Sequence, residues 1–421
     1  KQSKKIDYGK YPKSSFYDDM IKVTKNKTDK KLSKILVNDS HEVIYWLSKK
    51  GLKFVPIKGK QSFVVNGVTK YWGGLTLEVK NQGEGLVKSL TNIVKKNGIE
   101  IKYDVAAKKL IKKNNQIKGI GVLNKGNKEL ILCNSVILAC GGFEANSKMR
   151  SKYLGKGWDK AKVRGTKHNT GDGLNMAFEH DAARYGEWNG CHAVFHDMNG
   201  PKFSDLKIAA KYRKISYPWG IVLNANGERF VDEGEDLRNY TYAKFGREVI
   251  KQPKQFAWQI FDQKIRPMLY NEYDVKSATK VKANSLEDLV KKLKGVNANK
   301  ALSTILKYNQ SVNTKVKFDP TIKDGKNTKG LKINKSNWAN KIDKSPFYAF
   351  GVTCGITFTF GGLKINNKCE VLDNRKKPIK GLYAAGEMVG GIFYLNYPGG
   401  SGLMSGSVFG RIAGKYAAKL S

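Results

Sequence analysis

Long apolar stretches are absent from this chain of 421 residues. The best candidate, residues 130–143, is interrupted by Asn134 and Ser135, whereas a membrane-spanning helix needs about 18 or more consecutive apolar residues. The first residues, KQSKKIDYGKYPKSS, are basic, but the apolar core of a secretory signal does not follow them. We therefore expect no transmembrane segment, no secretory signal in this chain and a cytoplasmic location.

Cysteine is scarce as well. The five cysteines form an odd, scattered set without a CxxC pair: Cys133, Cys140, Cys191, Cys354 and Cys369. Disulfide frameworks and the usual zinc and iron–sulfur sites need paired or closely spaced cysteines, so the pattern argues against all three. We expect buried, reduced thiols and no metal centre.

Acidic residues are outnumbered. The sequence has 36 Asp and Glu against 77 Lys and Arg, a formal net charge of +41. A basic surface has affinity for phosphates, so a nucleic-acid-binding or scaffold protein without cofactor is one interpretation. The excess, however, is mostly lysine spread over the whole length, without the arginine and aromatic clusters that stack on bases. We expect no nucleic-acid partner, but a positive field that attracts a polyanionic small substrate or an acidic membrane surface.

Glycine, by contrast, is concentrated near the end of the chain. A short apolar strand at residues 382–385 leads into Gly386 and Glu387. Five glycines then fall within thirteen residues: Gly390, Gly391, Gly399, Gly400 and Gly402. Apolar residues at helical spacing follow, so we expect a helix whose first N–H groups hold the pyrimidine end of a flavin, or a phosphate. A tight strand-to-helix turn packed on a sheet explains the same glycines equally well.

A second strand also ends in glycine. Residues 135–139 run into Cys140, Gly141 and Gly142, so we expect two strand ends at the edge of one ligand site in an α/β sheet. Three further strands are expected, the last two as an antiparallel pair: residues 99–103, 117–122 and 129–132.

The GxGxxG fingerprint of dinucleotide-binding folds is missing from the first hundred residues. Either the fold binds no dinucleotide, or its first βαβ unit lies before Lys1. We favour the second alternative, because the chain begins within helical sequence and without an initiator methionine.

Several stretches of the chain resemble a known family. ILACGGFEAN, NTGDGLNMA, GERFVDE, AAGEMVGG and NYPGGSGLMSGSVFGRIAG resemble the FAD-dependent fumarate reductase and succinate dehydrogenase flavoprotein superfamily, and the similarity spans essentially the whole chain. RGTKHNTGDGL, GEWNGCHAVFHD, RNYTYAKFG, CGITFTFGGL and LNYPGGSGL most resemble its tricarballylate dehydrogenase branch. The family's N-terminal segment with GxGxxG has no counterpart here, so we expect the chain to be a fragment of a longer protein.

The resemblance implies an α/β fold of two parts with FAD as cofactor. Residues 1–187 and 356–421 would form an FAD-binding, Rossmann-like domain of the glutathione-reductase type, and residues 188–355 an inserted α+β capping domain. By position, the cofactor would be held as follows: adenine by Val105 and Ala106, the pyrophosphate or ribityl side by Gly141 and Gly142, the flavin wall by Asp172 and Gly173, and ribityl and isoalloxazine by Gly386, Glu387, Gly400, Gly402 and Leu403.

The resemblance also implies the chemistry. A proton leaves the carbon next to a carboxylate, a hydride passes from the neighbouring carbon to flavin N5, and a tricarboxylate such as tricarballylate becomes the cis-aconitate-type alkene. His192 would bind a substrate carboxylate, and Arg266 in FDQKIR would transfer the proton with Glu233 and Arg238 as relay. Without the family, His192 is typical of a packed core histidine and Arg266 of a surface ion pair.

Two departures from the family affect the substrate. Residues 357–360, TFTF, replace a second substrate histidine, and Tyr397 in NYPGG replaces a carboxylate-binding arginine. Tyr397 can donate a hydrogen bond but cannot neutralise a carboxylate, so it becomes a catalytic candidate for a differently shaped substrate. Fumarate-like, urocanate-like and 3-ketosteroid substrates remain alternatives. The expected redox partner is a membrane-associated iron–sulfur or cytochrome protein, which would place the enzyme at the inner membrane face.

Overall fold

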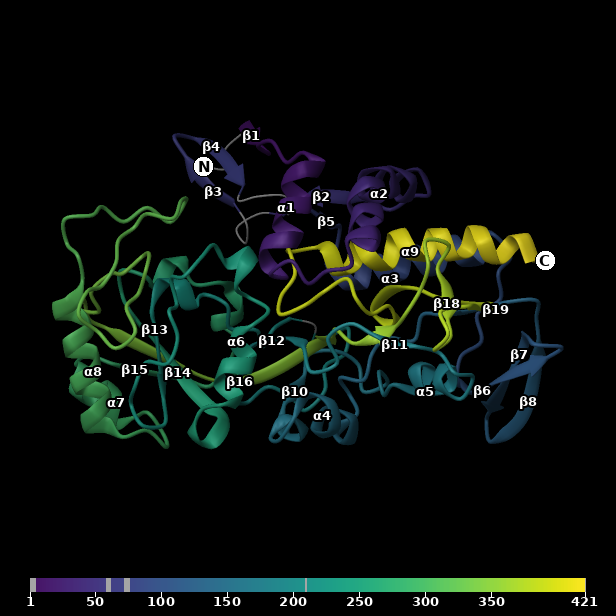
Figure 1. The fold of residues 1–421 in the computed structure, drawn as a ribbon. Helices are drawn as coiled ribbons and strands as arrows, with labels where there is room; N and C mark the ends of the chain where they lie inside the picture. Colours follow the sequence, from purple (N-terminus) through teal and green to yellow (C-terminus); the bar gives the residue numbers. More distant parts are fainter. Residues whose placement is uncertain (1–4, 58–61, 72–75, 209, 421) are drawn as a thin grey trace.

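The computed structural model describes residues 5–57, 62–71, 76–208 and 210–420. Figure 1 shows an elongated molecule with different elements at its two ends. Strands β13 (Ile221–Asn224) and β15 (Lys280–Ala283) lie at one end, with helices α7 (Leu286–Lys291) and α8 (Ala298–Ser311). The C-terminal helix α9 (Ser401–Ala417) extends to the other.

A parallel strand pair lies beneath the C-terminal helix. Strand β9 (Val136–Leu138) pairs in parallel with β19 (Pro378–Ala384), which also pairs with β18 (Glu370–Leu372). Helix α9 packs against β19 and against α2 (Lys30–Lys49), above the strands in Figure 1. The predicted strands at 135–139 and 382–385 and the helix after the glycine loop are therefore confirmed.

An antiparallel ribbon extends from this region. It consists of β6 (Val105–Lys113), β7 (Gln116–Asn124) and β8 (Asn127–Leu132), which confirms the predicted pair at 117–122 and 129–132. The strand predicted at residues 99–103 is wrong: the segment pairs with no strand of the described chain, and β6 begins only at Val105. Its apolar side chains stay exposed, since Ile99 and Tyr103 keep 58% and 63% of their surface accessible.

The other half of the molecule is built on one long strand. Strand β16 (Phe347–Thr359) pairs with four others in different stretches of its length: β10 (Lys162–Val163), β12 (Cys191–Asp197), β14 (Phe256–Asp262) and β15. Nearly every residue of β12, β13 and β14 is buried, as in a sheet covered on both faces. Helix α6 (Phe245–Ile250) packs on β12 and β16, and α7 packs on β15 and β16.

The remaining elements are short. They are α1 (Lys13–Val23), α3 (Gln82–Lys96), α4 (Ser147–Leu154), α5 (Asp172–Phe178), β1 (Lys5–Asp7) with β3 (Ser62–Val65) and β4 (Val68–Tyr71), β2 (Phe54–Pro56) with β5 (Leu77–Val79), and β11 (Arg184–Tyr185) with β17 (Gly362–Leu363). Among the described residues, no helix is long and apolar enough to cross a membrane.

The buried apolar residues form several clusters. The largest draws on residues 20–182 and 360–417, with Ala243 added from between them, while three others draw on residues 158–356. The domain limits at 187/188 and 355/356 stay a proposal that this distribution favours. Three of the five cysteines are buried, but Cys140 is exposed and Cys133 intermediate, since both lie where strands end in turns.

Candidate flavin and substrate site

Two glycine turns meet at one edge of the parallel pair. Leu138 on β9 lies opposite Ala384 on β19, so the turns that follow both strands leave the sheet side by side. A Cβ added to Gly142 would lie 2.0 Å from Thr359 Oγ1 and 2.3 Å from Glu387 Oε1. The backbone of one turn therefore lies against the Glu387 side chain of the other and against Thr359 at the end of β16, and the expected neighbourhood of the two strand ends is confirmed.

Other predicted cofactor residues gather around these turns. Gly173 faces Cys140, whose Sγ would lie 2.6 Å from an added Cβ, and Gly141, at a φ of 76°, faces the Asn169 amide. Asp172 is the exposed first residue of α5, after Gly171 as N-cap. Val105 and Ala106 begin β6, which contacts α5. The structure thus brings these residues into one region, and their contacts with the cofactor stay a proposal.

Helix α9 begins beside the same turns. Its N-cap, Gly400, has a φ of 86°, and no side chain caps its first N–H groups. Further along, Gly406 approaches Gly386 closely, since a Cβ on Gly386 would lie 3.8 Å from the Gly406 Cα. Leu403 keeps 68% of its surface exposed in the first turn, and Ser405 Oγ is buried without a partner among the described residues. The helix start therefore offers free donors and an apolar contact to a ligand.

Two buried carboxyl groups lie between the turns. Glu387 Oε1 accepts hydrogen bonds from Thr359 N at 2.7 Å and Thr359 Oγ1 at 3.0 Å, and Asn169 Nδ2 donates to Glu144 Oε1 at 2.5 Å. Burial raises the pKa of both carboxyl groups, and the proximity of Glu387 raises that of Glu144 further. Glu144 Oε2 is buried without a hydrogen-bond partner among the described residues. Glu144 was missed from the sequence, although it stands in the GGFEAN motif.

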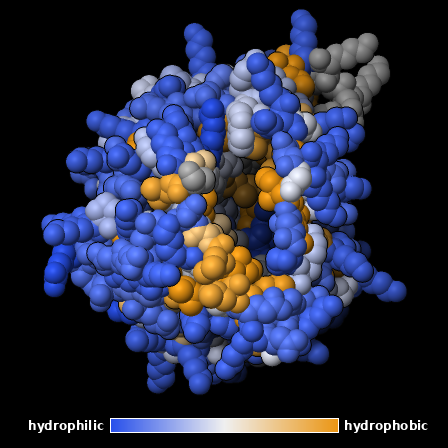
Figure 2. Space-filling view, turned by 90° about the vertical axis from the view of Figure 1, so that its right-hand side faces the viewer, coloured by the Kyte–Doolittle hydropathy of each residue, from blue (hydrophilic) through white to orange (hydrophobic). Residues whose placement is uncertain are grey.

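These features suit FAD, which is long, flat and rich in hydroxyl groups. The ribityl chain carries donors for the carboxyl groups, the glycine turns allow close approach of a ring, and the uncapped helix suits the electron-rich pyrimidine. Figure 2 shows a hollow with an apolar rim on the face at the β6–β8 end of the molecule. Elements at this end expose Leu130 and Leu132 on β8 and Ile137 on β9. The residues present therefore fit the cofactor.

His192 and Tyr397 contact each other next to the end of β16. His192 lies on β12 opposite Phe358, and Tyr397 precedes α9. The Tyr397 hydroxyl lies 2.6 Å from His192 Nδ1, and the two residues are 7% and 3% exposed. His192 Nε2 is buried without a partner among the described residues. The ring of Tyr242 completes the group, with centroids 5.0 Å from His192 and 5.9 Å from Tyr397.

Three arginines from separate segments surround this group. Arg164, after β10, donates to Thr357 Oγ1 at 2.8 Å, Arg247 on α6 donates to the Leu395 carbonyl, and Arg213 pairs with Glu272 at 2.7 Å. Neither Arg164 nor Arg247 forms an ion pair with any described residue. Burial, then the charge of Arg213, lower the pKa of Arg164 to about 10. None of the three was predicted, although Arg164 stands in the RGTKHNTGDGL motif.

The arginines determine the charge state of His192. Its pKa lies well below the usual value of 6.5, first because the ring is buried and then because Arg164, Arg213 and Arg247 disfavour a further positive charge. The imidazole is therefore neutral near pH 7. An anionic ligand that compensates the arginines would raise this pKa again.

Arg266 lies apart from the His192 group, and its role in the proton step stays a prediction that this position disfavours. Its guanidinium pairs with Asp274 and lies 5.6 Å from the Tyr348 ring centroid. Tyr348 precedes Phe358, the partner of His192, by ten residues of β16, which at about 3.3 Å per residue places the two roughly 30 Å apart. Arg266, in the FDQKIR segment, lies at the surface of the half of the molecule that carries β14 to β16. There its side chain forms an ion pair with Asp274.

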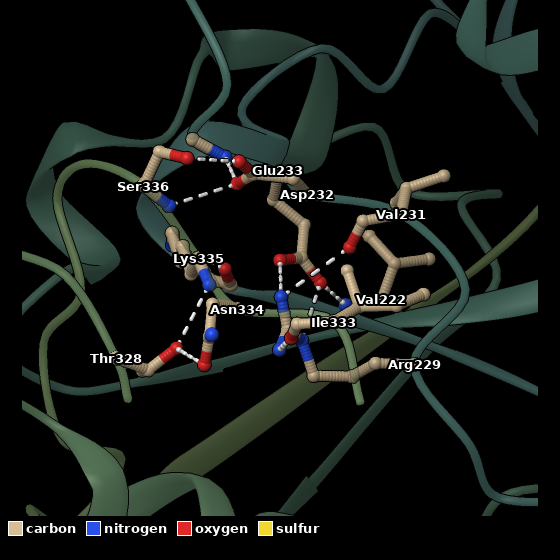
Figure 3. A network of polar contacts seen from close by, with 12 residues as sticks. Val222, Arg229, Val231, Asp232, Glu233, Thr328, Ile333, Asn334, Lys335 and Ser336 are labelled. Atoms are coloured by element: carbon tan, nitrogen blue, oxygen red, sulfur yellow. Dashed lines mark hydrogen bonds and ion pairs between the residues drawn. The ribbon is translucent and has the colours of Figure 1, made fainter. Parts of the chain in front are cut away.

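Glu233 lies in a buried network of hydrogen bonds, which disfavours its predicted relay role, and that role stays a prediction. Its Oε1 accepts from Val222 N at 2.8 Å and from Arg229 Nε at 3.1 Å, while Oε2 pairs with Arg229 (Figure 3). Lys335 lies in the same network and donates to the carbonyls of Pro218 and Gly220. Both oxygens of Glu233 are thus occupied, and they stabilise the half of the molecule that carries β13.

Arg238 remains near the candidate site. It is 5% exposed, and its guanidinium lies 5.4 Å from the centroid of the Tyr270 ring. Burial raises the pKa of Tyr242, whereas a hydrogen bond with Tyr397 and then the charge of Arg238 oppose that rise. Arg238 therefore acts electrostatically on the His192 group, as Arg164 and Arg213 do.

The sequence profile of a family described as FAD binding domain matches residues 5–403. The chain belongs to this FAD binding domain family. FAD is thus the cofactor of this chain. The fold is that of an FAD-binding flavoprotein with mixed helices and sheets.

Several enzymes are similar to this protein over nearly the whole chain. The probable fumarate reductase Ifc3 of Shewanella frigidimarina is 30% identical over 410 residues, 96% of this chain and 64% of the relative. The NADH:fumarate oxidoreductase of Klebsiella pneumoniae is 28% identical over 97% of this chain and 41% of its own length. The chain thus spans less than two thirds of the length of these relatives.

Solved structures agree with this assignment. The open conformation of a flavocytochrome c3 fumarate reductase matches with a TM-score of 0.71 and 26% identity, over 98% of this chain and 68% of that one. A 3-ketosteroid delta1-dehydrogenase from Sterolibacterium denitrificans matches with a TM-score of 0.72 and 20% identity, over 97% of this chain and 89% of that one, which shows the fold alone.

Proposed function

We propose that the protein is an FAD-dependent dehydrogenase of CH–CH bonds that acts on a tricarboxylate such as tricarballylate. The arginines around His192 carry the proposal. Arg164 and Arg247 have no carboxylate partner among the described residues, and Arg164 has lost enough of its surrounding water to lower its pKa to about 10. Cationic groups held in place without counterions are costly unless a ligand supplies the negative charge. A small molecule with several carboxylates supplies it.

The positions of these cations favour a polycarboxylate of different shape from fumarate. Phe358 lies opposite His192, and Tyr397 bonds to it, so the family's second histidine and its arginine are both replaced by uncharged side chains. The positive charges come instead from Arg164, Arg213 and Arg247, on other segments of the chain. When bound, the flavin accepts the hydride. The residues of this chain orient the carboxylates and exclude water from the reacting carbons.

A neutral substrate is the alternative. Phe358, Phe393 and Tyr397 form an aromatic wall, with ring centroids 5.8 Å apart for the two phenylalanines and 5.0 Å apart for Phe393 and Tyr397. Such a wall would suit a ring-shaped substrate of the 3-ketosteroid or urocanate kind. The arginines without carboxylate partners argue against a neutral substrate, because such a ligand would not neutralise their positive charge.

Electron transfer belongs to the same proposal. A solved relative is named a flavocytochrome, and relatives from Klebsiella pneumoniae and Vibrio harveyi are named NADH oxidoreductases. We propose that electrons leave to a separate, membrane-associated iron–sulfur or cytochrome protein, with the enzyme in the cytoplasm at the inner membrane face. Rapid turnover with a nicotinamide nucleotide as sole acceptor would count heavily against this partner.

Anaerobic titration of the FAD-loaded, full-length protein with tricarballylate tests the substrate. We expect a change in flavin absorbance at low substrate, bleaching of the oxidised flavin band and a cis-aconitate-type product by mass spectrometry. Affinity should fall as salt rises, because the arginines are screened. Bleaching by a 3-ketosteroid, with no response to tricarballylate, would replace this proposal by the alternative.

A further inference from the structure

One short segment, residues 236–242, lies between helix α1 and the His192 group. Its last residue, Tyr242, places a ring 5.0 Å from that of His192, and Arg238 is close enough for its charge to act on the Tyr242 hydroxyl. Two other side chains of the segment contact α1 instead. The place of two residues at the substrate site therefore depends on how α1 holds this segment.

Helix α1 holds Tyr240 by two kinds of contact. Asp19 Oδ2 accepts a hydrogen bond from the Tyr240 hydroxyl, with the two oxygens 3.0 Å apart, and Lys22 Nζ lies 4.4 Å from the centroid of the Tyr240 ring. Lys22 Nζ also lies 2.8 Å from Asp236 Oδ2. Asp19 and Lys22 are three residues apart, so they share one face of the helix. The hydroxyl and the ring of Tyr240 are thus both engaged, which fixes the orientation of the side chain.

These contacts act on geometry more than on stability. The side chains of Lys22 and Asp236 are 54% and 17% exposed, and an ion pair in contact with water contributes little to the free energy of unfolding. The hydrogen bond from Tyr240 to the carboxylate is the stronger contact, because its acceptor is charged. Burial raises the pKa of the Tyr240 hydroxyl, and the charge of Asp19 raises it further, so the phenol stays a neutral donor.

The loop before α9 bonds to the same tyrosine. Asn396 Nδ2 donates to the Tyr240 carbonyl, and Asn396 Oδ1 accepts from Tyr397 N at 2.8 Å. Tyr397 in turn contacts His192. Tyr240 therefore joins α1, the segment 236–242 and the Tyr397 loop, so a shift of its side chain would reach the substrate site through both the segment and the loop.

We propose, on the basis of the function proposed above, that Asp19 and Lys22 are positioning residues of the substrate site. They hold Tyr240, and through it they set the place of Arg238 and Tyr242. They act by this contact and not by touching the substrate or the flavin. A displacement of about 1 Å in the supporting structure can cost about 10²-fold in rate. Loss of the contact should therefore slow the chemical step more than it weakens substrate binding.

Substitutions that remove single groups test the positioning in the FAD-loaded, full-length protein. Tyr240→Phe removes the hydroxyl, and Lys22→Met removes the charge from a side chain of similar length. Each should slow anaerobic flavin reduction at saturating tricarballylate by about 5- to 50-fold, while the midpoint of the flavin shift changes by less than about threefold. Lys22→Arg keeps the charge and should reduce at nearly the normal rate.

Tyr11→Phe is the matched control. The Tyr11 hydroxyl donates to the same oxygen, Asp19 Oδ2, at 2.6 Å, but Tyr11 lies outside the segment 236–242. The variant should reduce at the normal rate. Equal slowing in Tyr11→Phe and Tyr240→Phe would show that α1 was loosened as a whole, and it would overturn the proposal. Reduction within about twofold of the normal rate in both Tyr240→Phe and Lys22→Met would overturn it as well.

A measurement without turnover separates this proposal from the choice of substrate. The chain has five histidines, so the ¹³C-labelled imidazole signal of His192 can be assigned with the His192→Gln variant. The ring of Tyr242 meets the imidazole edge to face, so its displacement changes the ring current at His192. Tyr240→Phe and Lys22→Met should shift the signal, and Tyr11→Phe should not. An unmoved signal in the first two variants overturns the positioning role. If tricarballylate neither shifts nor reduces the flavin, the substrate proposal fails, and the imidazole signal still decides the positioning role.

Discussion

The hydroxyl of Tyr397 lies 2.6 Å from Nδ1 of His192, across 205 positions of sequence. The contact joins the loop before α9 to strand β12, and so it ties the proposed FAD domain to the proposed capping domain. Around it, arginines from three segments provide the charge that a polycarboxylate needs. The predictions below follow from these contacts and from the glycine turns.

Arg164→Gln should weaken tricarballylate binding by about 10- to 100-fold, because a charge-assisted contact to a carboxylate is lost. Titration of the flavin absorbance measures the effect, and the salt dependence of binding should become shallower. Arg375→Gln removes the same charge from an exposed turn and serves as control. Equal affinities of the two variants would show that Arg164 does not face the substrate.

Gly142→Ala should weaken FAD binding. The new Cβ would lie 2.3 Å from Glu387 Oε1 and 2.0 Å from Thr359 Oγ1, so the two turns must separate. Overpacking of this kind costs about 1–3 kcal/mol, which corresponds to about 5- to 150-fold in affinity. The flavin-to-protein absorbance ratio after dialysis measures the loss. Gly410→Ala, on α9 with nothing within 4 Å of the added Cβ, should keep its FAD.

Arg266→Ala should turn over at nearly the normal rate. The residue is ion-paired with Asp274 and lies beside Tyr348, which precedes the strand partner of His192 by roughly 30 Å of β16 at about 3.3 Å per residue. Steady-state kinetics with tricarballylate and an artificial electron acceptor check this. A loss of turnover with intact FAD spectra would place Arg266 in the chemistry after all.

Lys335 should make stability depend on pH. Burial lowers the pKa of its ammonium group from 10.5 to about 8, so above pH 8 the folded chain gives up a proton that the unfolded chain still holds. The contribution of this group to stability therefore rises between about pH 8 and 10.5. Lys335→Met lacks the titration, so the difference in Tm between the two proteins should change across that window. A constant difference would mean that Lys335 titrates as an ordinary lysine.

The local sequence was sufficient for the frame of the flavin site. Glycines follow the apolar strands that end near Leu138 and Ala384, because the turns there need backbone conformations that glycine allows. The helix after Gly400 is predicted by the spacing of its apolar residues. These patterns depend on interactions between residues that are close in sequence, so the turns and the helix could be predicted without knowledge of the fold. The strand expected at 99–103 failed because a strand also needs a partner, and none lies beside it among the described residues.

Only the tertiary structure decided which charged residues share the substrate site. Arg266 and Glu233 stand in family-like motifs, but pairing along β14, β16 and β13 carries Arg266 to the surface and Glu233 into the network with Arg229. Arg164 stands in the RGTKHNTGDGL motif, but neither it nor Arg247 could be assigned to the site from local sequence, because the residues around them come from strands and loops far away in sequence. The sequence by itself determined the cofactor and its turns, where the physics is local. The long-range pairing of β12 and β16, together with the contact of Tyr397 on His192, determined which side chains surround His192, because electrostatic interactions depend on distance in space.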